Sequence, residues 1–213
     1  MADFNRRLPV YLLIDCSGSM RGERIEAVKQ GIKSLVSELK SDPQALETAY
    51  LSVITFSSNA KQEEKLTELM LFKEPDLKAE GATMFGRALE LLINCINTEV
   101  RKSTNTQKGD WKPLVFILTD GAPSDIHDFK RCAEILKKMP IANIVACAAG
   151  ADAKTEYLKM ITDNVLMMNS LSAGDMAKFF AWVSTSIKMT SNKADVSPNA
   201  FPVPPDSNGF QLV

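Results

Sequence analysis

The sequence has 213 residues, of which 45% are hydrophobic and 24% are charged, and its formal net charge is −1. A chain of this length and composition can bury one substantial core, as soluble globular proteins do. The near-zero net charge argues against binding to nucleic acid or to an anionic membrane, since both favour basic surfaces. No apolar run approaches the roughly 20 residues that span a bilayer. We therefore expect a cytoplasmic protein.

Hydrophobic patterns in the first half of the chain predict alternating strands and helices. Residues 8–15 form a continuous apolar run, typical of a strand buried on both faces, and residues 23–40 carry apolar side chains at helical spacing. Residues 49–56 and 65–72 predict two more strands. Because no long helical segment separates these two strands, they are expected to pair antiparallel. A helix is expected over residues 84–101.

The second half of the chain continues this alternation. Further strands are expected at 112–120, 141–150 and 165–169, and further helices at 126–138, 154–161 and 172–189. This order predicts an α/β layer sandwich around a mostly parallel sheet, formed by residues 1–190 as one domain. From residue 191 to 213 the composition shifts to Ser, Asn, Pro and Asp, which predicts a flexible tail. The apolar end of this tail, FQLV, is either a docking peptide or a loose end.

The four cysteines give no sign of a zinc site. They are Cys16, Cys95, Cys132 and Cys147. No two are close enough in sequence for a CxxC pair, and each stands in an apolar or helical context. We expect four buried, free thiols.

Carboxylate and hydroxyl side chains gather at three strand-to-helix or loop-to-helix junctions. They are Asp15, Ser17, Ser19, Thr83 and Asp120. Ligands bind at the carboxyl ends of the parallel strands in open α/β sheets, so we expect these five side chains at one edge of the sheet. Two carboxylates and three hydroxyls are hard oxygen donors, which suit Mg²⁺, Mn²⁺ or Ca²⁺ better than zinc or copper. Such a shell leaves the ion a position for a carboxylate from another molecule.

The residues at these junctions resemble a known family. Residues 15–19 (DCSGS) match the DxSxS signature of von Willebrand factor A (VWA) domains. Thr83 in EGAT matches the metal-site threonine of that family, and Asp120 in LTDG matches its distal aspartate. The likeness extends to about residue 190. More narrowly, the segments LPVYLLID, ALETAYLSVITF and GDWKPLVFILTDGAPSD resemble TerY-like proteins of bacterial tellurite-resistance and stress gene clusters.

The resemblance implies an α/β fold with a doubly wound, mostly parallel six-stranded sheet, one antiparallel edge strand and helices on both faces. It also implies an intact metal-ion-dependent adhesion site (MIDAS). There Ser17 and Ser19 would bind the ion directly, Asp15 and Asp120 would act largely through water, and Thr83 would join or leave the shell. The ion would grip a carboxylate of an acidic protein partner, with a kinase or phosphatase of the same gene cluster suggested by the TerY-like likeness. Some family members carry a C-terminal zinc-binding extension, for which this chain has no cysteine cluster.

Two enzyme classes share part of this pattern. A Mg²⁺-dependent phosphatase of the haloacid dehalogenase type needs a second aspartate as general acid two residues after the first, where this chain has Ser17. A serine hydrolase needs a G-x-S-x-G elbow and a catalytic histidine, but the single histidine, His127, stands near a predicted helix start. We therefore expect a binding module and not an enzyme. The remaining alternative is a metal-independent scaffold that uses a sheet edge or the tail.

Side chains near the expected site also have ordinary structural roles. Asp125 and Asp128 are expected to cap the helix at 126–138 in preference to lining a rim. Phe85 either packs beneath its loop or, if exposed together with Met84, contacts a partner.

Overall fold

The structure is a computed structural model that describes residues 6–150, 153–192 and 210–213. Its single sheet has the order β3-β2-β1-β4-β5-β6-β7. Five strands run parallel, whereas β3 is antiparallel to β2 and β7 is antiparallel to β6. The parallel strands are β1 (Leu8–Asp15), β2 (Ala49–Phe56), β4 (Leu114–Thr119), β5 (Asn143–Ala149) and β6 (Val165–Met168). This arrangement confirms the predicted doubly wound α/β fold.

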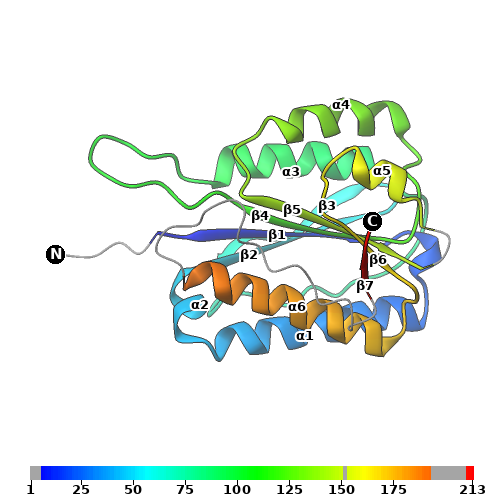
Figure 1. Ribbon diagram of the computed structural model, residues 1–213, viewed down its shortest axis with the longest axis horizontal. Coiled ribbons are helices and arrows are strands. Elements are labelled where there is room, and N and C mark those ends of the chain that lie inside the picture. The colour runs from blue at the N-terminus through cyan, green and yellow to red at the C-terminus, as the bar shows by residue number, and fades with distance from the viewer. Residues whose placement is uncertain (1–5, 151–152, 193–209) are drawn as a thin grey trace.

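Helices cover both faces of the sheet (Figure 1). One face carries α1 (Glu23–Lys40), α2 (Pro43–Thr48) and α6 (Ala173–Ser191), and the other carries α3 (Phe85–Glu99), α4 (Ile126–Lys137) and α5 (Thr155–Lys159). Each face has its own apolar core. Along β1, Leu12 and Ile14 point into one core, and Tyr11 and Leu13 into the other. Both faces of β1 therefore need apolar side chains, which explains the continuous apolar run along the strand.

Two neighbouring helices approach closely on the first face. The site of approach is Gly31 on α1, where a side-chain carbon would overlap the ring of Phe180 on α6. The glycine therefore lets α1 and α6 pack together over the sheet.

The strand β3 (Ala60–Glu68) begins and ends earlier than the predicted strand over 65–72. It is an edge strand of mixed exposure with a largely polar sequence, AKQEEKLTE, so the apolar stripe used for the prediction does not mark it. Leu69 is buried just beyond the strand, and Leu71 is 65% exposed in the following turn. The antiparallel pairing of β2 with β3 is as predicted.

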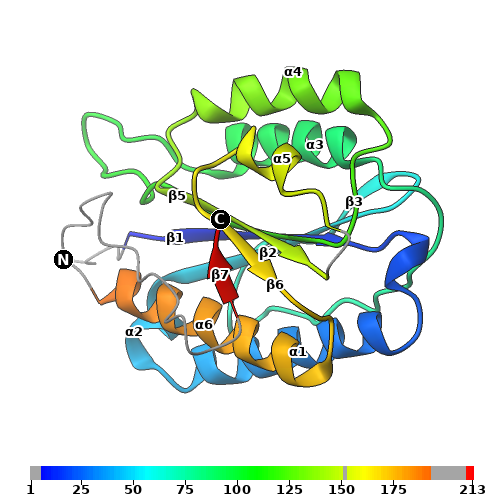
Figure 2. The ribbon, with the colours of Figure 1, turned by 45° about the vertical axis from the view of Figure 1, so that its right-hand side comes forward.

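Three short elements were not expected from the sequence, the first of which is a 3-10 helix over Gly18–Met20. The helix α2 begins at Pro43, and the Asp42 carboxylate caps it by accepting a hydrogen bond from the Ala45 amide at 2.8 Å. The strand β7 (Phe210–Leu212) pairs with β6 at the sheet edge (Figure 2), which makes seven strands where six were expected. At the start of the predicted tail, Ser191 ends α6 and Asn192 follows it. Residues 193–209 of the tail lie outside the described residues. No helix in the described part of the chain combines the length and apolarity needed to cross a bilayer.

Candidate metal-binding site

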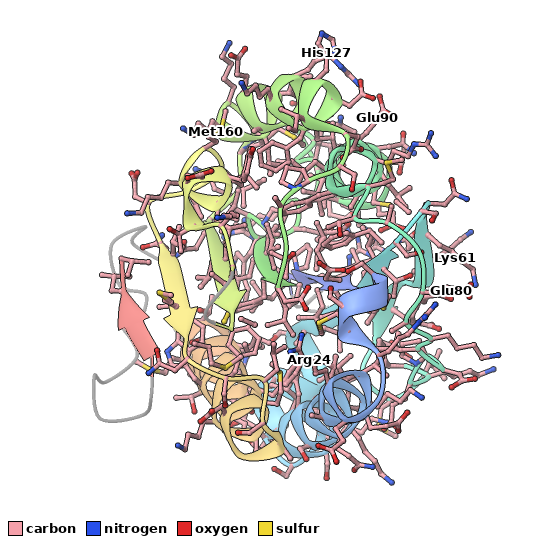
Figure 3. All side chains as sticks on the ribbon, turned by 90° about the vertical axis from the view of Figure 1, so that its right-hand side faces the viewer. Arg24, Lys61, Glu80, Glu90, His127 and Met160 are labelled. Carbon is pink, nitrogen blue, oxygen red and sulfur yellow. The ribbon has the colours of Figure 1, made fainter. Side chains whose placement is uncertain are left out.

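Three segments converge at the carboxyl ends of the central strands. The loop after β1 and the segment before α3 are joined by two backbone hydrogen bonds, from the Gly18 amide to the Gly81 carbonyl at 2.9 Å and from the Glu80 amide to the Cys16 carbonyl at 2.8 Å. The loop after β4 joins them through the Ser124 amide, which donates to the Thr83 carbonyl at 2.8 Å. Figure 3 looks onto this edge of the sheet. The fold therefore brings together the three junctions that the sequence singled out.

Asp15 forms the buried base of this region. Its side chain is inaccessible to solvent. Oδ1 accepts the Ser17 amide at 2.8 Å, and Oδ2 accepts the Thr119 hydroxyl at 2.6 Å. Burial raises the pKa of Asp15 above its ordinary value, the hydrogen bonds from Ser17 and Thr119 oppose that rise, and the charge of Asp120 adds to it. The carboxylate therefore organises the loop but pays an electrostatic cost for its charge.

Ser17, Ser19 and Asp120 form a continuous chain of oxygen atoms above Asp15. The hydroxyls of Ser17 and Ser19 lie 3.0 Å apart, and the Ser19 hydroxyl donates to Asp120 Oδ1 at 2.7 Å. Ser17 is buried, Ser19 is exposed and Asp120 is 9% exposed. This row of side-chain oxygen atoms therefore runs from the interior to the surface.

Thr83 approaches the same row from the segment before α3. Its amide donates to the Ser124 hydroxyl at 3.3 Å, and a side-chain carbon added to Gly121 would lie 3.6 Å from Thr83 Oγ1. The Thr83 hydroxyl therefore lies beside Gly121, the residue that follows Asp120. Within the described ranges this hydroxyl makes no hydrogen bond, whereas the other four predicted residues are linked to one another.

The chemistry of these donors fits a hard divalent cation. Nowhere in the described residues do three or more His, Cys, Asp or Glu side chains form a group that could hold a metal. The five residues instead supply two carboxylates and three hydroxyls, which Mg²⁺ and Mn²⁺ accept as ligands. The neighbouring Cys16 is buried, and burial raises its pKa to about 12, so it stays a neutral thiol. The other three cysteines are also buried and free, as predicted.

Two residues of this region were not singled out from the sequence. Thr119 holds Asp15, and the only signal for it is its position at the end of β4, directly before Asp120. Arg24 donates from Nη1 to Asp120 Oδ2 at 3.1 Å and to the Ser19 carbonyl at 3.1 Å. An arginine five residues after Ser19 carries no general sequence signal, because only the direction of α1 brings it back over the site.

The side chains around the site mostly have structural roles. Asp125 does not cap its own helix α4; its carboxylate instead accepts the amides of Gly86 and Arg87 at 2.9 Å each, at the start of α3. The prediction that Asp125 caps the helix at 126–138 was therefore wrong, because its carboxylate caps α3. Phe85 is buried and stacks on Phe56 with ring centroids 4.9 Å apart, so it packs beneath the loop. The side chain of His127 is 97% exposed.

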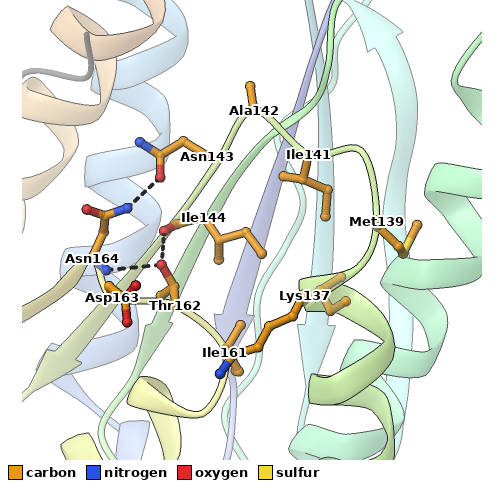
Figure 4. Close-up of a pocket in the computed structure, with 11 residues that line it drawn as sticks. Lys137, Met139, Ile141, Ala142, Asn143, Ile144, Ile161, Thr162, Asp163 and Asn164 are labelled. Carbon is orange, nitrogen blue, oxygen red and sulfur yellow. Dashed lines mark hydrogen bonds between the residues drawn. The ribbon is translucent and has the colours of Figure 1, made fainter. Parts of the chain in front are cut away.

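A hollow lies at the opposite edge of the sheet, near the amino ends of β5 and β6 (Figure 4). Its volume is about 410 Å³. Two of its polar side chains are hydrogen-bonded within it: the Thr162 hydroxyl donates to the Ile144 carbonyl at 2.7 Å, and the Asn164 amide side chain donates to Asn143 Oδ1 at 2.8 Å. Asp163 is the one carboxylate among its lining residues. This hollow therefore lacks the converging acidic donors found at the other edge.

Comparisons with known proteins agree with this fold. One protein of Synechocystis, described as uncharacterized protein sll0103, is 34% identical over 140 residues, which are 62% of this chain and 30% of that relative. A von Willebrand factor type A structure from Catenulispora acidiphila has a TM-score of 0.68 at 20% identity, covering 86% of this chain and 43% of that one. Proximal thread matrix protein 1 from the mussel byssus, solved with a zinc-occupied MIDAS motif, has a TM-score of 0.60 at 18% identity, covering 90% and 47%.

The chain thus spans less than a third of the length of its curated relative and under half of these two solved chains. At these identities the solved structures establish the fold alone. The family profile described as von Willebrand factor type A domain matches residues 10–181, which include all five predicted site residues. This chain belongs to the von Willebrand factor type A domain family.

Proposed function

We propose that this protein is a metal-dependent interaction module that binds a partner carboxylate through a divalent cation at a MIDAS. Ser17, Ser19 and Thr83 would hold the ion, and Asp15 and Asp120 would act largely through water. The observation that carries the proposal is the row of oxygen atoms from Ser17 through Ser19 to Asp120, with consecutive separations of 3.0 and 2.7 Å. A cation at this row would supply a Lewis-acidic position for an acidic ligand.

The electrostatics of the site support a cation. Asp15 is buried with the charge of Asp120 near enough to raise its pKa further. Two carboxylates held close together at the end of a low-dielectric core are stabilised by a divalent ion. The hydroxyls of Ser17, Ser19 and Thr83 add neutral donors, so the ion would keep net positive charge for an anionic partner.

The choice of metal follows from the donors. The zinc-occupied motif is a property of the byssus protein. In this chain the five donors include no imidazole and no thiolate, so Mg²⁺, Mn²⁺ or Ca²⁺ is the better match.

The same site supports binding in preference to catalysis. Ser17 stands where a haloacid dehalogenase-type phosphatase needs its general acid, and its hydroxyl bonds to Ser19. His127 projects into solvent on α4 and contacts Asp128, with nitrogen and oxygen atoms 4.0 Å apart. Among the described residues, neither side chain stands where these two enzyme classes place their acid–base group, which supports a binding role for the site.

The biological setting rests on the TerY-like segments of the sequence. On that likeness, the protein would work in a bacterial tellurite-resistance or stress-response system, with a kinase or phosphatase of the same gene cluster as its acidic partner. The four free, buried cysteines suit a reducing compartment such as the cytoplasm.

The test is to measure binding of the kinases and phosphatases encoded by neighbouring genes to immobilised protein, in Mg²⁺ and in chelator. We expect binding in Mg²⁺, loss in chelator, restoration by Mn²⁺, and no binding by the Ser17→Ala, Ser19→Ala double variant. Binding that survives both chelator and the double variant would favour the other candidate, a metal-independent scaffold. The observation behind that candidate is the edge strand β7, which the end of this chain adds to β6 in antiparallel pairing.

A further inference from the structure

Arg24 places a positive charge directly on the candidate metal site. It lies in the first turn of α1, and Figure 3 labels it on the edge that carries the site. Nη1 donates to Asp120 Oδ2 and to the Ser19 carbonyl, both at 3.1 Å. The Asp120 side chain is only 4% exposed, whereas that of Arg24 is 47% exposed. A half-exposed cation thus pairs with a buried carboxylate.

The pair leaves Asp120 with both oxygens engaged. Oδ1 accepts the Ser19 hydroxyl at 2.7 Å, and Oδ2 accepts Arg24. The five donor residues carry two negative charges, from Asp15 and Asp120, and Arg24 offsets one of them. A divalent ion that binds Asp120 has to share that carboxylate with the Arg24 guanidinium or displace the guanidinium.

We propose that Arg24 is a built-in counter-ion that competes with the divalent cation for Asp120 and so lowers the metal affinity of the site. This inference rests on the proposed metal-binding function. Two positive centres sharing one carboxylate repel each other, and the repulsion is partly relieved because a half-exposed arginine can swing into water. An ion that took over Asp120 would release Arg24 from that carboxylate.

A neighbouring arginine provides a matched control. Arg21 is exposed in the loop just before α1, but its Nε donates to the backbone carbonyl of Ala79 at 3.2 Å, and within the described ranges no carboxylate pairs with it. Arg21→Gln and Arg24→Gln therefore remove the same charge near the site, and only the second removes the contact with Asp120. Arg24→Lys keeps the charge and changes the geometry.

The experiment is calorimetric titration of Mn²⁺ into chelator-stripped wild type, R24Q, R24K and R21Q at low and at high salt. At low salt we expect R24Q to bind Mn²⁺ on the order of tenfold more tightly than wild type, because both competition and repulsion are removed. The gap narrows at high salt, since ions screen a half-exposed charge. R24K stays near wild type, and R21Q shifts the affinity far less than R24Q.

A thermal scan in chelator gives a second readout that needs no metal. R24Q is expected to melt below wild type there, since its buried Asp120 loses its ionic partner, while Mn²⁺ raises the R24Q midpoint by more than it raises that of wild type. Equal or weaker Mn²⁺ binding by R24Q, or an equal gain in R21Q, would overturn the role of Arg24 and leave the metal site standing. Absence of Mn²⁺ binding in both wild type and R24Q would overturn the metal site and this inference together.

Discussion

Thr119 donates its hydroxyl proton to Asp15 Oδ2 at 2.6 Å, which joins the ends of the neighbouring parallel strands β1 and β4 inside the core. Because Asp15 Oδ1 accepts the Ser17 amide, one buried carboxylate ties both strands to the loop that carries the two serines. The candidate metal site is therefore built on a hydrogen-bonded frame that belongs to the fold.

Replacing Thr119 with valine is expected to destabilise the protein by about 1–3 kcal/mol, because valine keeps the shape but leaves a buried carboxylate oxygen without its donor. Chemical denaturation of the chelator-treated protein measures this loss. Thr119→Ser keeps the hydroxyl and serves as the control. A T119V protein as stable as wild type would show that Oδ2 finds another partner.

Replacing Asp15 with asparagine is expected to separate folding from metal binding. The amide oxygen can accept the Ser17 amide, and the amide nitrogen can donate to Thr119, so the frame persists without a buried charge. In chelator D15N should be as stable as wild type or more so. In thermal scans at 100 times the wild-type dissociation constant, Mn²⁺ should stabilise wild type by about 2.7 kcal/mol and leave D15N unchanged. Stabilisation of D15N by Mn²⁺ to the wild-type extent would remove Asp15 from the site.

Replacing Gly31 with alanine is expected to cost about 1–3 kcal/mol, because the added carbon would overlap the Phe180 ring and force α1 from α6. The midpoint of denaturant unfolding reports this loss. Ser34→Ala, at an exposed position of the same helix, is the control and should have little effect. An unchanged midpoint in G31A would mean that the two helices separate at no cost.

The start of α6 is expected to weaken in acid. Hydrogen bonds from Ser170 and Ser172 lower the pKa of Asp175, with burial opposing them. A carboxyl with a lowered folded-state pKa contributes stability above its unfolded value, near roughly 3.9, and that contribution is lost as pH falls through the lower folded value. Stability measured from neutral pH into this acid range should therefore fall more in wild type than in Asp175→Asn. Parallel pH profiles for the two proteins would contradict the assignment.

Local patterns account for most of the fold prediction. The continuous apolar run of β1 reflects burial on both faces of the strand, and the helical spacing over 23–40 reflects burial on one face of α1. The predicted bounds of both elements agree with the structure. The polar edge strand β3 has no such pattern, and its bounds were misplaced. The strand β7 is three residues long and pairs with a strand more than 40 residues earlier, a contact that no local pattern encodes.

In the candidate site, too, local patterns were predictable from the sequence and long-range contacts were not. Asp15, Ser17 and Ser19 are close in sequence, and the topology of a parallel sheet brings Asp120 to them. The partner of Asp125 depends on how α3 and α4 pack, so capping of α3 could not be read from neighbouring residues. The ion pair of Arg24 with Asp120 likewise spans 96 positions and depends on the exact direction of α1.

The central claim is that this edge of the sheet binds a divalent cation. Its most direct test is calorimetric titration of Mg²⁺ and Mn²⁺ into chelator-stripped wild type, beside the Ser17→Ala, Ser19→Ala double variant checked for native circular dichroism. We predict saturable binding in wild type that disappears in the folded double variant. Binding of equal strength in the double variant, or no binding in wild type, would contradict the metal site.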